Sequence, residues 1–311
     1  MLLSLQSVSG GLVSVGVLYC ILSLLKRGKK VNIKGKVVLI TGASSGLGEA
    51  CAKVFHSQGC RVILAGRSEE RLNAVKRALL KSKISPVKDY QEPAILKLDL
   101  EDLNSLHEKG RQALHLFGGV DILINNAGIS YRGCIQDTTI DVDQKLMTVN
   151  YFGHVAFIKA LLPAMLSQKS GHIVGISSVQ GKMSIPYRSA YSASKHALQA
   201  FFDCLRAELA DTCVSVSVLS PGYIRTNLST SAVCGDGSVH GVMDKTTESG
   251  MAAEAVAERV LRSVLYRQPE EIIAPLHHHL AVILRVVAPQ VFFTIMAKRA
   301  RKQRKDYVKH D

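Results

Sequence analysis

The sequence has little of what metal or disulfide chemistry needs. It contains seven cysteines in 311 residues, but no Cys-x-x-Cys pair and no histidine or cysteine spacing typical of a metal site. The thiols are therefore expected to be free, small apolar groups in a reducing compartment. The run His277–His279 has no second group of ligands near it in the chain, so no metal site is predicted.

Long linkers and low-complexity runs are also absent from the sequence. With 47% hydrophobic residues, a chain of this length can bury a full core. One α/β domain with appendages at its ends fits the length better than two independent domains.

Basic residues are concentrated near the two ends of the chain, within a net charge of +14 at neutral pH. Residues 26–36 include six basic and no acidic residues, and residues 298–311 include seven basic and two acidic ones. Between these flanks the charge nearly balances, and no lysine or arginine run alternates with aromatic residues. A nucleic-acid-binding protein is therefore not predicted.

An uncharged segment precedes the first basic flank. Residues 2–25 contain no charged side chain, and as a helix they would extend about 36 Å, enough to cross a bilayer core of about 30 Å. No basic residue comes before this segment and no small-x-small cleavage site follows it, which favours a retained anchor over a cleaved signal peptide. We therefore predict a transmembrane anchor over residues 1–25 and a basic linker over residues 26–36.

The membrane that holds this single-pass anchor is expected to be that of the endoplasmic reticulum, with the peroxisomal membrane left open as the alternative. Because the positive charge follows the span directly, the positive-inside rule favours a cytosolic position for the rest of the chain.

Short apolar, β-branched runs alternate with helical stretches from residue 37 onward. The predicted strands cover residues 37–41, 61–66, 94–100, 120–128, 171–178, 214–222 and 270–275. The main helical stretches cover residues 48–58, 69–80, 141–167, 191–210 and 253–266. This alternation predicts an α/β domain over 37–275, with a doubly wound parallel sheet of about seven strands. Ligands of such sheets bind beyond the carboxyl ends of the strands.

The segment TGASSGLGEA, residues 41–50, follows the first predicted strand and leads into a helix. Gly42 permits a tight turn, Gly46 lets the backbone approach a pyrophosphate, and Gly48 lets the helix pack close to the sheet. The start of the helix offers unpaired N–H groups to phosphates. The segment therefore predicts a dinucleotide site, and the further contacts expected from it are Ser44, Ser45 and Leu47.

Tyr191 and Lys195 lie one helical turn apart in the segment YSASK. A tyrosine with its ordinary pKa near 10 is a poor acid or base at neutral pH. The charge of Lys195 favours the ionised phenol, so that the pair could exchange a proton with the alkoxide formed when hydride reduces a ketone. The spacing alone is common enough to arise by chance, so the assignment depends on its context.

That context is a set of five motifs, TGASSGLG, NNAG, GHIVGISS, YSASK and SPG, in this order. Together they closely resemble the short-chain dehydrogenase/reductase family over residues 35–275. The resemblance implies a Rossmann-type fold and a catalytic tetrad of Asn150, Ser178, Tyr191 and Lys195. Tyr191 would be the acid/base, Ser178 would hydrogen-bond the substrate carbonyl, Lys195 would also hold the ribose, and Asn150 would support a water relay.

The cofactor preference depends on the end of the second strand, in LAGRS. An NAD enzyme usually has an acidic residue there to bind the ribose 2′-hydroxyl. Gly66 occupies that position and Arg67 follows it, so NADP(H) is favoured over NAD(H) because arginine pairs with a 2′-phosphate. The alternative is that Arg67 is only a solvated residue. By resemblance, Asp99 meets the adenine, Asn126 the adenosine ribose and Thr226 the carboxamide.

Two segments in the last third of the chain fall outside these motifs. Residues 229–250 are polar and contain glycine, and are predicted to form a mobile substrate lid, with a plain surface insertion as the alternative. Residues 276–311 are apolar and then basic. Arg285 and Pro289 disfavour a second span, so we expect an interfacial helix with its basic end near anionic headgroups. The alternative is a helix that packs over the substrate pocket or a neighbouring subunit.

The sequence thus predicts a membrane-anchored, NADP(H)-dependent oxidoreductase that interconverts a ketone and a secondary alcohol on an apolar, lipid-like substrate. The competing class is a catalytically silent nucleotide-binding adaptor that acts through protein contacts at the membrane. No tetrad residue is missing, which argues against that class. The resemblance also implies a homodimer formed through the two long helices. The sequence departs from the family pattern at Gly175, where many members carry Asn.

Overall fold

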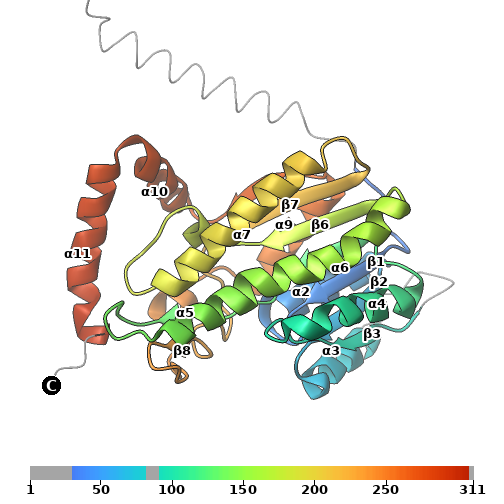
Figure 1. Cartoon of the computed structure of the whole chain (residues 1–311), viewed down its shortest axis with the longest axis horizontal. Helices are drawn as coiled ribbons and strands as arrows, with labels where there is room; N and C mark the ends of the chain where they lie inside the picture. Colours follow the sequence, from blue (N-terminus) through green and yellow to red (C-terminus); the bar gives the residue numbers. More distant parts are fainter. Residues whose placement is uncertain (1–29, 82–90, 308–311) are drawn as a thin grey trace, which may run out of the picture.

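The computed structural model describes residues 30–81 and 91–307, with side chains up to residue 304. The predicted anchor over residues 1–25 lies outside the described residues. A seven-stranded sheet forms the centre of the molecule, with the strand order β3-β2-β1-β4-β6-β7-β9 (Figure 1). All its pairings are parallel, which confirms the predicted Rossmann-type fold. The strands are β1 (Val37–Thr41), β2 (Arg61–Gly66), β3 (Ala94–Lys97), β4 (Ile122–Asn125), β6 (Gly171–Ile176), β7 (Val214–Pro221) and β9 (Glu270–Ile273).

The winding of the sheet reverses at β1. This strand pairs with β2 on one side and with β4 on the other, so the chain first runs outward to β3 and then returns to build the other half from β4. The loops that follow β1 and β4 therefore diverge to opposite faces. The crevice between such loops is where ligands of open parallel sheets bind.

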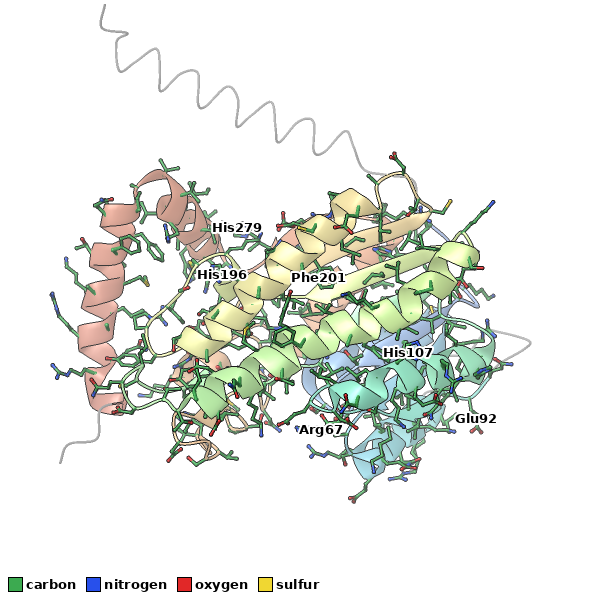
Figure 2. The ribbon with its side chains drawn as sticks, viewed as in Figure 1. Arg67, Glu92, His107, His196, Phe201 and His279 are labelled. Atoms are coloured by element: carbon green, nitrogen blue, oxygen red, sulfur yellow. The ribbon has the colours of Figure 1, made fainter. Side chains whose placement is uncertain are left out.

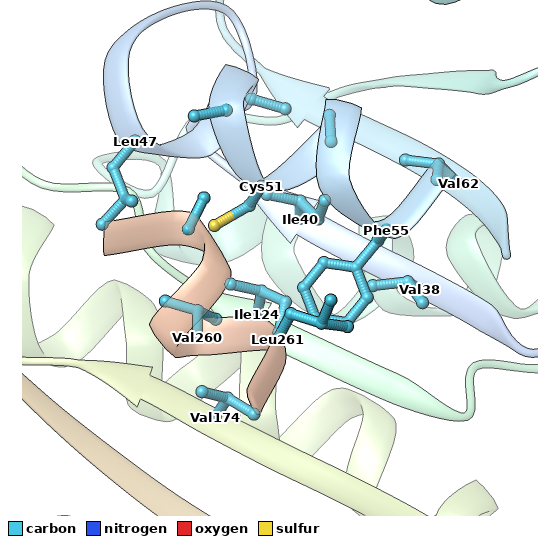
Figure 3. Close-up of a cluster of buried hydrophobic side chains, with 14 of the residues drawn as sticks. Val38, Ile40, Leu47, Cys51, Phe55, Val62, Ile124, Val174, Val260 and Leu261 are labelled. Atoms are coloured by element: carbon cyan, nitrogen blue, oxygen red, sulfur yellow. The ribbon is translucent and has the colours of Figure 1, made fainter. Parts of the chain in front are cut away.

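Helices cover both faces of the sheet. In β1, Val38 and Ile40 join one apolar cluster, which includes α2, α3 and α9, and Val37 and Leu39 join the other, with α4, α6 and α7. Successive strand residues point to opposite faces, which explains why these strands are apolar throughout rather than alternating. Figure 3 shows the first cluster, where the Phe55 ring lies beside Leu261 of α9 and Val38 of β1. The helices are α2 (Gly46–Ser57), α3 (Glu69–Lys81), α4 (Leu106–Phe117), α6 (Gly153–Ser167), α7 (Ser189–Glu208) and α9 (Ala253–Leu265).

The helix predicted over residues 141–167 is interrupted. It consists of α5 (Ile140–Met147), a π-helical turn over Thr148–Phe152, and α6. Among the described residues it is the one helix long and apolar enough to cross a membrane. However, Phe157 and Leu161 are fully buried in the second cluster, so it is a core helix of the domain. Turns of this kind occur often at functional sites, and this one carries Asn150.

The C-terminal segment forms a helical hairpin instead of the single helix expected. It comprises α10 (Leu276–Val287) and α11 (Pro289–Tyr307), which meet at Ala288. Pro289 starts the second helix because proline fits the first turn of a helix but not its interior. Figure 1 shows the hairpin standing at one end of the domain, in red.

The predicted lid has structure of its own. The short strands β5 (Tyr131–Arg132) and β8 (Val233–Cys234) pair with each other, and α8 (Lys245–Glu248) follows. The segment 229–250 is thus joined by backbone hydrogen bonds to the loop that follows β4.

Candidate active site

The loop after β1 is built for close backbone approach. Gly42 and Gly46 have positive φ angles of 67° and 57°, a conformation that side chains disfavour. A Cβ atom at Gly42 would lie 2.9 Å from Ala127 Cα, and one at Gly48 would lie 2.1 Å from the Gly42 carbonyl oxygen. Glycine is therefore required at Gly42 and Gly48 for β1, α2 and the loop after β4 to meet.

The start of α2 leaves hydrogen-bond donors available. Ser45 precedes the helix, and its side chain makes no capping hydrogen bond, so the first N–H groups of α2 have no intrahelical partner. Ser45 is exposed and Ser44 half-buried, whereas Leu47 is buried in the core. The two serines can thus offer side chains and backbone to phosphates, and Leu47 only its backbone. A nicotinamide dinucleotide fits this cradle.

Two other predicted cofactor residues border the same loop. Asn126 donates its side-chain N–H to the Thr41 carbonyl oxygen at 2.9 Å, and its backbone N–H to Thr41 Oγ1 at 2.9 Å. This side chain therefore joins the ends of β1 and β4. Thr226, from the loop after β7, has its methyl carbon 3.1 Å from where a Cβ of Gly46 would lie, which brings it directly over the glycine loop.

Arg67 and Asp99 follow the ends of β2 and β3. Arg67 is exposed (Figure 2), and no hydrogen bond or ion pair joins its side chain to another described residue. Asp99 is half-buried, and its Oδ1 accepts the Glu101 backbone N–H at 3.0 Å. Both residues lie at the carboxyl edge of the sheet, Arg67 after β2, which pairs with β1, and Asp99 after the edge strand β3.

The four predicted catalytic residues come together from three elements. Ser178 follows β6, Tyr191 and Lys195 lie in the first turns of α7, and Asn150 lies in the π-helical turn. Ser178 Oγ accepts the Gln180 N–H at 3.1 Å and lies close enough to Tyr191 to favour a lower pKa of the phenol. Lys195 Nζ lies 5.9 Å from the centre of the Tyr191 ring. All four side chains are buried.

Asn150 and Lys195 are fixed by the backbone around them. Asn150 Oδ1 accepts the Ile129 N–H at 2.9 Å, and Asn150 Nδ2 donates to the Ile129 carbonyl at 2.9 Å. Lys195 Nζ donates to the Ile176 carbonyl at 3.0 Å. A Cβ at Gly128 would lie 3.0 Å from Asn150 Oδ1 and 3.6 Å from Lys195 Nζ, so a side chain at this position would crowd both groups.

Burial determines the direction of the pKa shifts of Tyr191 and Lys195. Burial raises the pKa of Tyr191 above its usual value near 10, and the nearby Ser178 hydroxyl and the charge of Arg132 offset only part of this. Burial also lowers the pKa of Lys195 from 10.5 to about 8. The sequence led us to expect an acidified phenol, but desolvation outweighs the nearby charge here.

His154 is a buried residue of this region that the motifs did not indicate. Its Nε2 lies 2.8 Å from the Ala127 carbonyl oxygen, within the NNAG segment. Burial, with a contribution from the charge of Lys195, lowers the pKa of His154 to about 3. The ring is thus neutral and holds the loop after β4 against α6. Its only signal in the sequence was a histidine within an apolar helix.

A buried ion-pair cluster joins segment 229–250 to the site, and no motif in the sequence indicated it. Arg132 donates from Nε to Asp244 Oδ2 at 2.8 Å, and Arg188 Nη2 lies 3.4 Å from the same oxygen. Burial alone would raise the pKa of Asp244, but its hydrogen bond to Arg132 and the charges of both arginines hold it below its usual range. Arg188 directly precedes α7, so the lid is tied close to Tyr191.

Comparison with known proteins places these residues in a family. A family profile described as short chain dehydrogenase matches residues 36–234. Dehydrogenase/reductase SDR family member 7B of Xenopus tropicalis is 53% identical over 294 residues, covering 94% of this chain and 94% of that protein. Dehydrogenase/reductase SDR family protein 7-like of Drosophila melanogaster is 53% identical over 271 residues, covering 87% of this chain and 82% of that protein.

Solved structures agree with this result. A short chain dehydrogenase/reductase from Burkholderia phymatum in complex with NAD has a TM-score of 0.73 at 25% identity, covering 84% of this chain and 96% of its own. A metagenomic short-chain oxidoreductase in complex with NADP has a TM-score of 0.64 at 27% identity, covering 79% of this chain and 99% of its own. The chain therefore belongs to the short-chain dehydrogenase/reductase family, as an NAD(P)-dependent oxidoreductase and a close homologue of dehydrogenase/reductase SDR family member 7B.

Proposed function

We propose that the chain is a membrane-anchored, NADP(H)-dependent oxidoreductase that interconverts a ketone and a secondary alcohol on an apolar, lipid-like substrate. The observation that carries the reaction type is the convergence of Ser178, Tyr191 and Lys195 beyond the carboxyl ends of the strands, beside the glycine loop. A bound nicotinamide supplies or accepts the hydride.

The side chains of the site manage the proton. In the reducing direction, the Tyr191 hydroxyl donates its proton to the oxygen of the substrate as the carbonyl becomes an alkoxide. The Ser178 hydroxyl hydrogen-bonds that oxygen and so orients it. The Lys195 ammonium stabilises the phenolate that remains. Asn150 holds the π-helical turn to Ile129, which keeps the floor of the site in position for a water relay to Lys195.

The assignment of Tyr191 is tested by Tyr191→Phe, with Tyr266→Phe at the end of α9 as the matched control. NADPH oxidation is followed with a panel of ketones that includes long-chain acyl ketones and steroids, using the full chain in detergent. We expect Tyr191→Phe to lower kcat by about 10²- to 10⁴-fold while NADPH binding persists. Turnover that survives this change would overturn the acid/base role.

The adaptor alternative has no specific observation in its favour. It would gain support if the wild-type chain bound no NADPH by fluorescence titration, because the catalytic residues would then serve no reaction.

NADP(H) is proposed as the preferred cofactor because of Arg67. Its guanidinium is exposed and makes no ion pair with another described residue, and Gly66 provides no carboxylate for a 2′-hydroxyl. Arg67→Asp should weaken NADPH binding and strengthen NADH binding. Arg71→Asp, an equal charge change on the exposed side of α3, should leave the ratio of the two affinities unchanged. If the ratio does not respond to Arg67→Asp, the preference lies elsewhere.

The domain organisation is part of the same proposal. We infer an anchor over residues 1–25, a basic linker over 26–36, a catalytic domain over 37–275 with its lid at 229–250, and a membrane-associated segment over 276–311. The endoplasmic reticulum, or alternatively the peroxisome, would hold the anchor, with the catalytic domain cytosolic. Protease protection of the C-terminal tail in intact microsomes tests the orientation.

A homodimer through α5, α6 and α7 is also proposed. It is supported by the exposure of Phe152 and Ile140, which are 47% and 68% exposed although they belong to the longest helical element of the domain. Phe152→Asp should then shift the sedimentation of the detergent-solubilised chain from dimer to monomer.

A further inference from the structure

The inner side of the α10–α11 hairpin is attached to segments that flank the candidate active site. Phe292 of α11 is only 2% exposed and packs with Val179 and Met183, which follow Ser178 in the chain. The Tyr187 hydroxyl donates to the Ala300 carbonyl at 3.0 Å. The hairpin therefore packs against the segment between Ser178 and α7, directly beside the candidate active site.

A second contact holds the hairpin to the loop after β7. Arg299 Nη2 donates to the Tyr223 hydroxyl at 3.0 Å, and the Tyr223 ring lies 6.0 Å from that of His278 in α10. Both helices thus contact the loop that continues to Thr226. The hairpin is a fixed part of the domain and has a defined outer side.

The outer side of α10 is apolar and has no partner among the described residues. Leu276, Leu280, Ile283 and Val287 recur at helical spacing and are 72%, 56%, 57% and 76% exposed. They form one stripe along the helix, and Val286 beside them is 77% exposed. Soluble monomers rarely expose a contiguous apolar surface of this kind unless something binds it.

The exposed apolar residues continue into α11. Val291, Phe293 and Ile295 are 51%, 51% and 45% exposed. Of the eighteen large hydrophobic residues exposed in the described part of the chain, eight lie between residues 276 and 295. The surface is therefore a local concentration and not the ordinary scatter of exposed side chains.

Charge indicates which partner this surface fits. Residues 272–305 contain no aspartate or glutamate. The exposed basic residues at the far end of α11 are Lys298, Arg301, Lys302 and Arg304. Arg285 lies on α10 with its guanidinium 4.9 Å from the Phe293 ring, and its long stem allows the charge to reach a polar interface. An anionic bilayer offers apolar chains to the stripe and negative headgroups to the basic residues beside it. It therefore complements this surface better than another protein would.

We propose that the outer side of the α10–α11 hairpin docks on the surface of an anionic bilayer, so that the element packed beside the active site rests on the membrane. A lipid substrate could then pass from the bilayer to Tyr191 beneath the hairpin, a step that rests on the proposed function. The docking deepens the membrane association proposed above for residues 276–311, and it requires no catalytic turnover.

The test uses the fact that the sequence contains no tryptophan, so one introduced indole reports alone. The full chain carrying Val286→Trp is reconstituted in vesicles of phosphatidylcholine and phosphatidylserine with brominated acyl chains. The matched control is Leu116→Trp on α4, where the replaced leucine is 40% exposed. We expect blue-shifted emission and at least twofold quenching for Val286→Trp, and neither for Leu116→Trp.

The outcomes separate the possible occupants. Equal, weak quenching at both positions would overturn the proposal. Alternatively, the emission of Val286→Trp could shift to the blue with increasing protein concentration and without quenching. A second copy of the chain would then cover the surface, and the proposal would also be overturned. Quenching that falls at least twofold when phosphatidylserine is omitted, or when Lys298, Arg301 and Lys302 are changed to Gln, would support the part played by charge. Because no substrate is needed, a failed activity assay cannot produce any of these results.

Discussion

At the scale of single residues, the burial of a catalytic group in the site lowers the stability of the folded protein. Lys195 is 4% exposed, and among the described residues its ammonium donates to one acceptor, the Ile176 carbonyl. A buried ammonium with one neutral acceptor is poorly compensated for its lost hydration, and the lowered pKa of Lys195 reflects this. The proposed reaction requires the positive charge of Lys195, which explains why a lysine occupies this buried position.

Lys195→Met should therefore stabilise the protein at neutral pH while abolishing turnover. Since the pKa of Lys195 is about 8 in the folded chain against 10.5 normally, the unfolded chain binds more protons between these values. Stability of the wild type should rise with pH in that window, by about 3 kcal/mol in all. The advantage of Lys195→Met should be largest below pH 8 and shrink toward pH 10.5. Chemical denaturation at several pH values measures it, and a constant difference would contradict the prediction.

Close packing explains why residue 175 is a glycine and not the Asn that is common in the family. A Cβ atom there would lie 2.5 Å from the Cζ atom of Phe202, and Phe202 is fully buried in α7. The strand β6 can therefore pack this closely against α7 only without a side chain at this position.

Gly175→Ala should lower the free energy of unfolding by about 1–3 kcal/mol, as overpacking does in other cores. Gly175→Ala combined with Phe202→Leu should lose less than the sum of the two single changes, because the smaller side chain makes room for the methyl group. Thermal denaturation of the four chains measures this coupling. Simple additivity would show that the close contact is not the cause.

At the scale of elements, one carboxylate joins segment 229–250 to the residues that flank the site. Asp244 receives hydrogen bonds from Arg132, and Arg188 lies close by, both arginines being buried. Removing one member of a buried ion pair leaves uncompensated charge behind. The position of segment 229–250 therefore depends on Asp244 more than on its short strand β8.

Asp244→Asn should cost about 3 kcal/mol or more and should increase proteolysis and hydrogen exchange within residues 229–250. Glu248→Gln, in the same segment but exposed, should change stability by about 0.5 kcal/mol or less. If the two variants exchanged equally, the lid would be held by other contacts.

At the scale of the whole molecule, one buried apolar side chain of α11 packs the hairpin against the domain, beside the hydrogen bonds from Tyr187 and Arg299. Phe292 is 2% exposed, whereas its neighbour Phe293 is 51% exposed. The two phenylalanines therefore give a matched pair for testing whether the hairpin is fixed to the domain.

Phe292→Ala should loosen residues 276–304, because truncating a buried phenylalanine costs about 3–5 kcal/mol. Phe293→Ala should cost about 1 kcal/mol or less, through its contact with Arg285. Hydrogen exchange followed by mass spectrometry measures both. Protection that is unchanged in Phe292→Ala would mean that Tyr187 and Tyr223 suffice to hold the hairpin.

Much of this protein was evident from local patterns. Apolar runs and their alternation with helices predict the sheet, because buried parallel strands are apolar on both faces. Gly42, Gly46 and Gly48 indicate the backbone geometry of the loop after β1. The spacing of Tyr191 and Lys195 places both residues on one face of a helix. These features are short-range, so each is visible in a few consecutive residues.

Other features depend on residues that meet only after folding. The sequence alone determined the fold class, the glycine loop and the family, because motif order and periodicity are properties of the chain itself. Only the tertiary structure decided that Asp244 meets Arg132 across 112 positions, that Phe202 leaves no room for a side chain at Gly175, and that Phe292 packs the C-terminal helices against the segment after Ser178. Burial also reversed the expected shift in the pKa of Tyr191, since the loss of solvent around a side chain is decided by its packing partners and not by its neighbours in sequence.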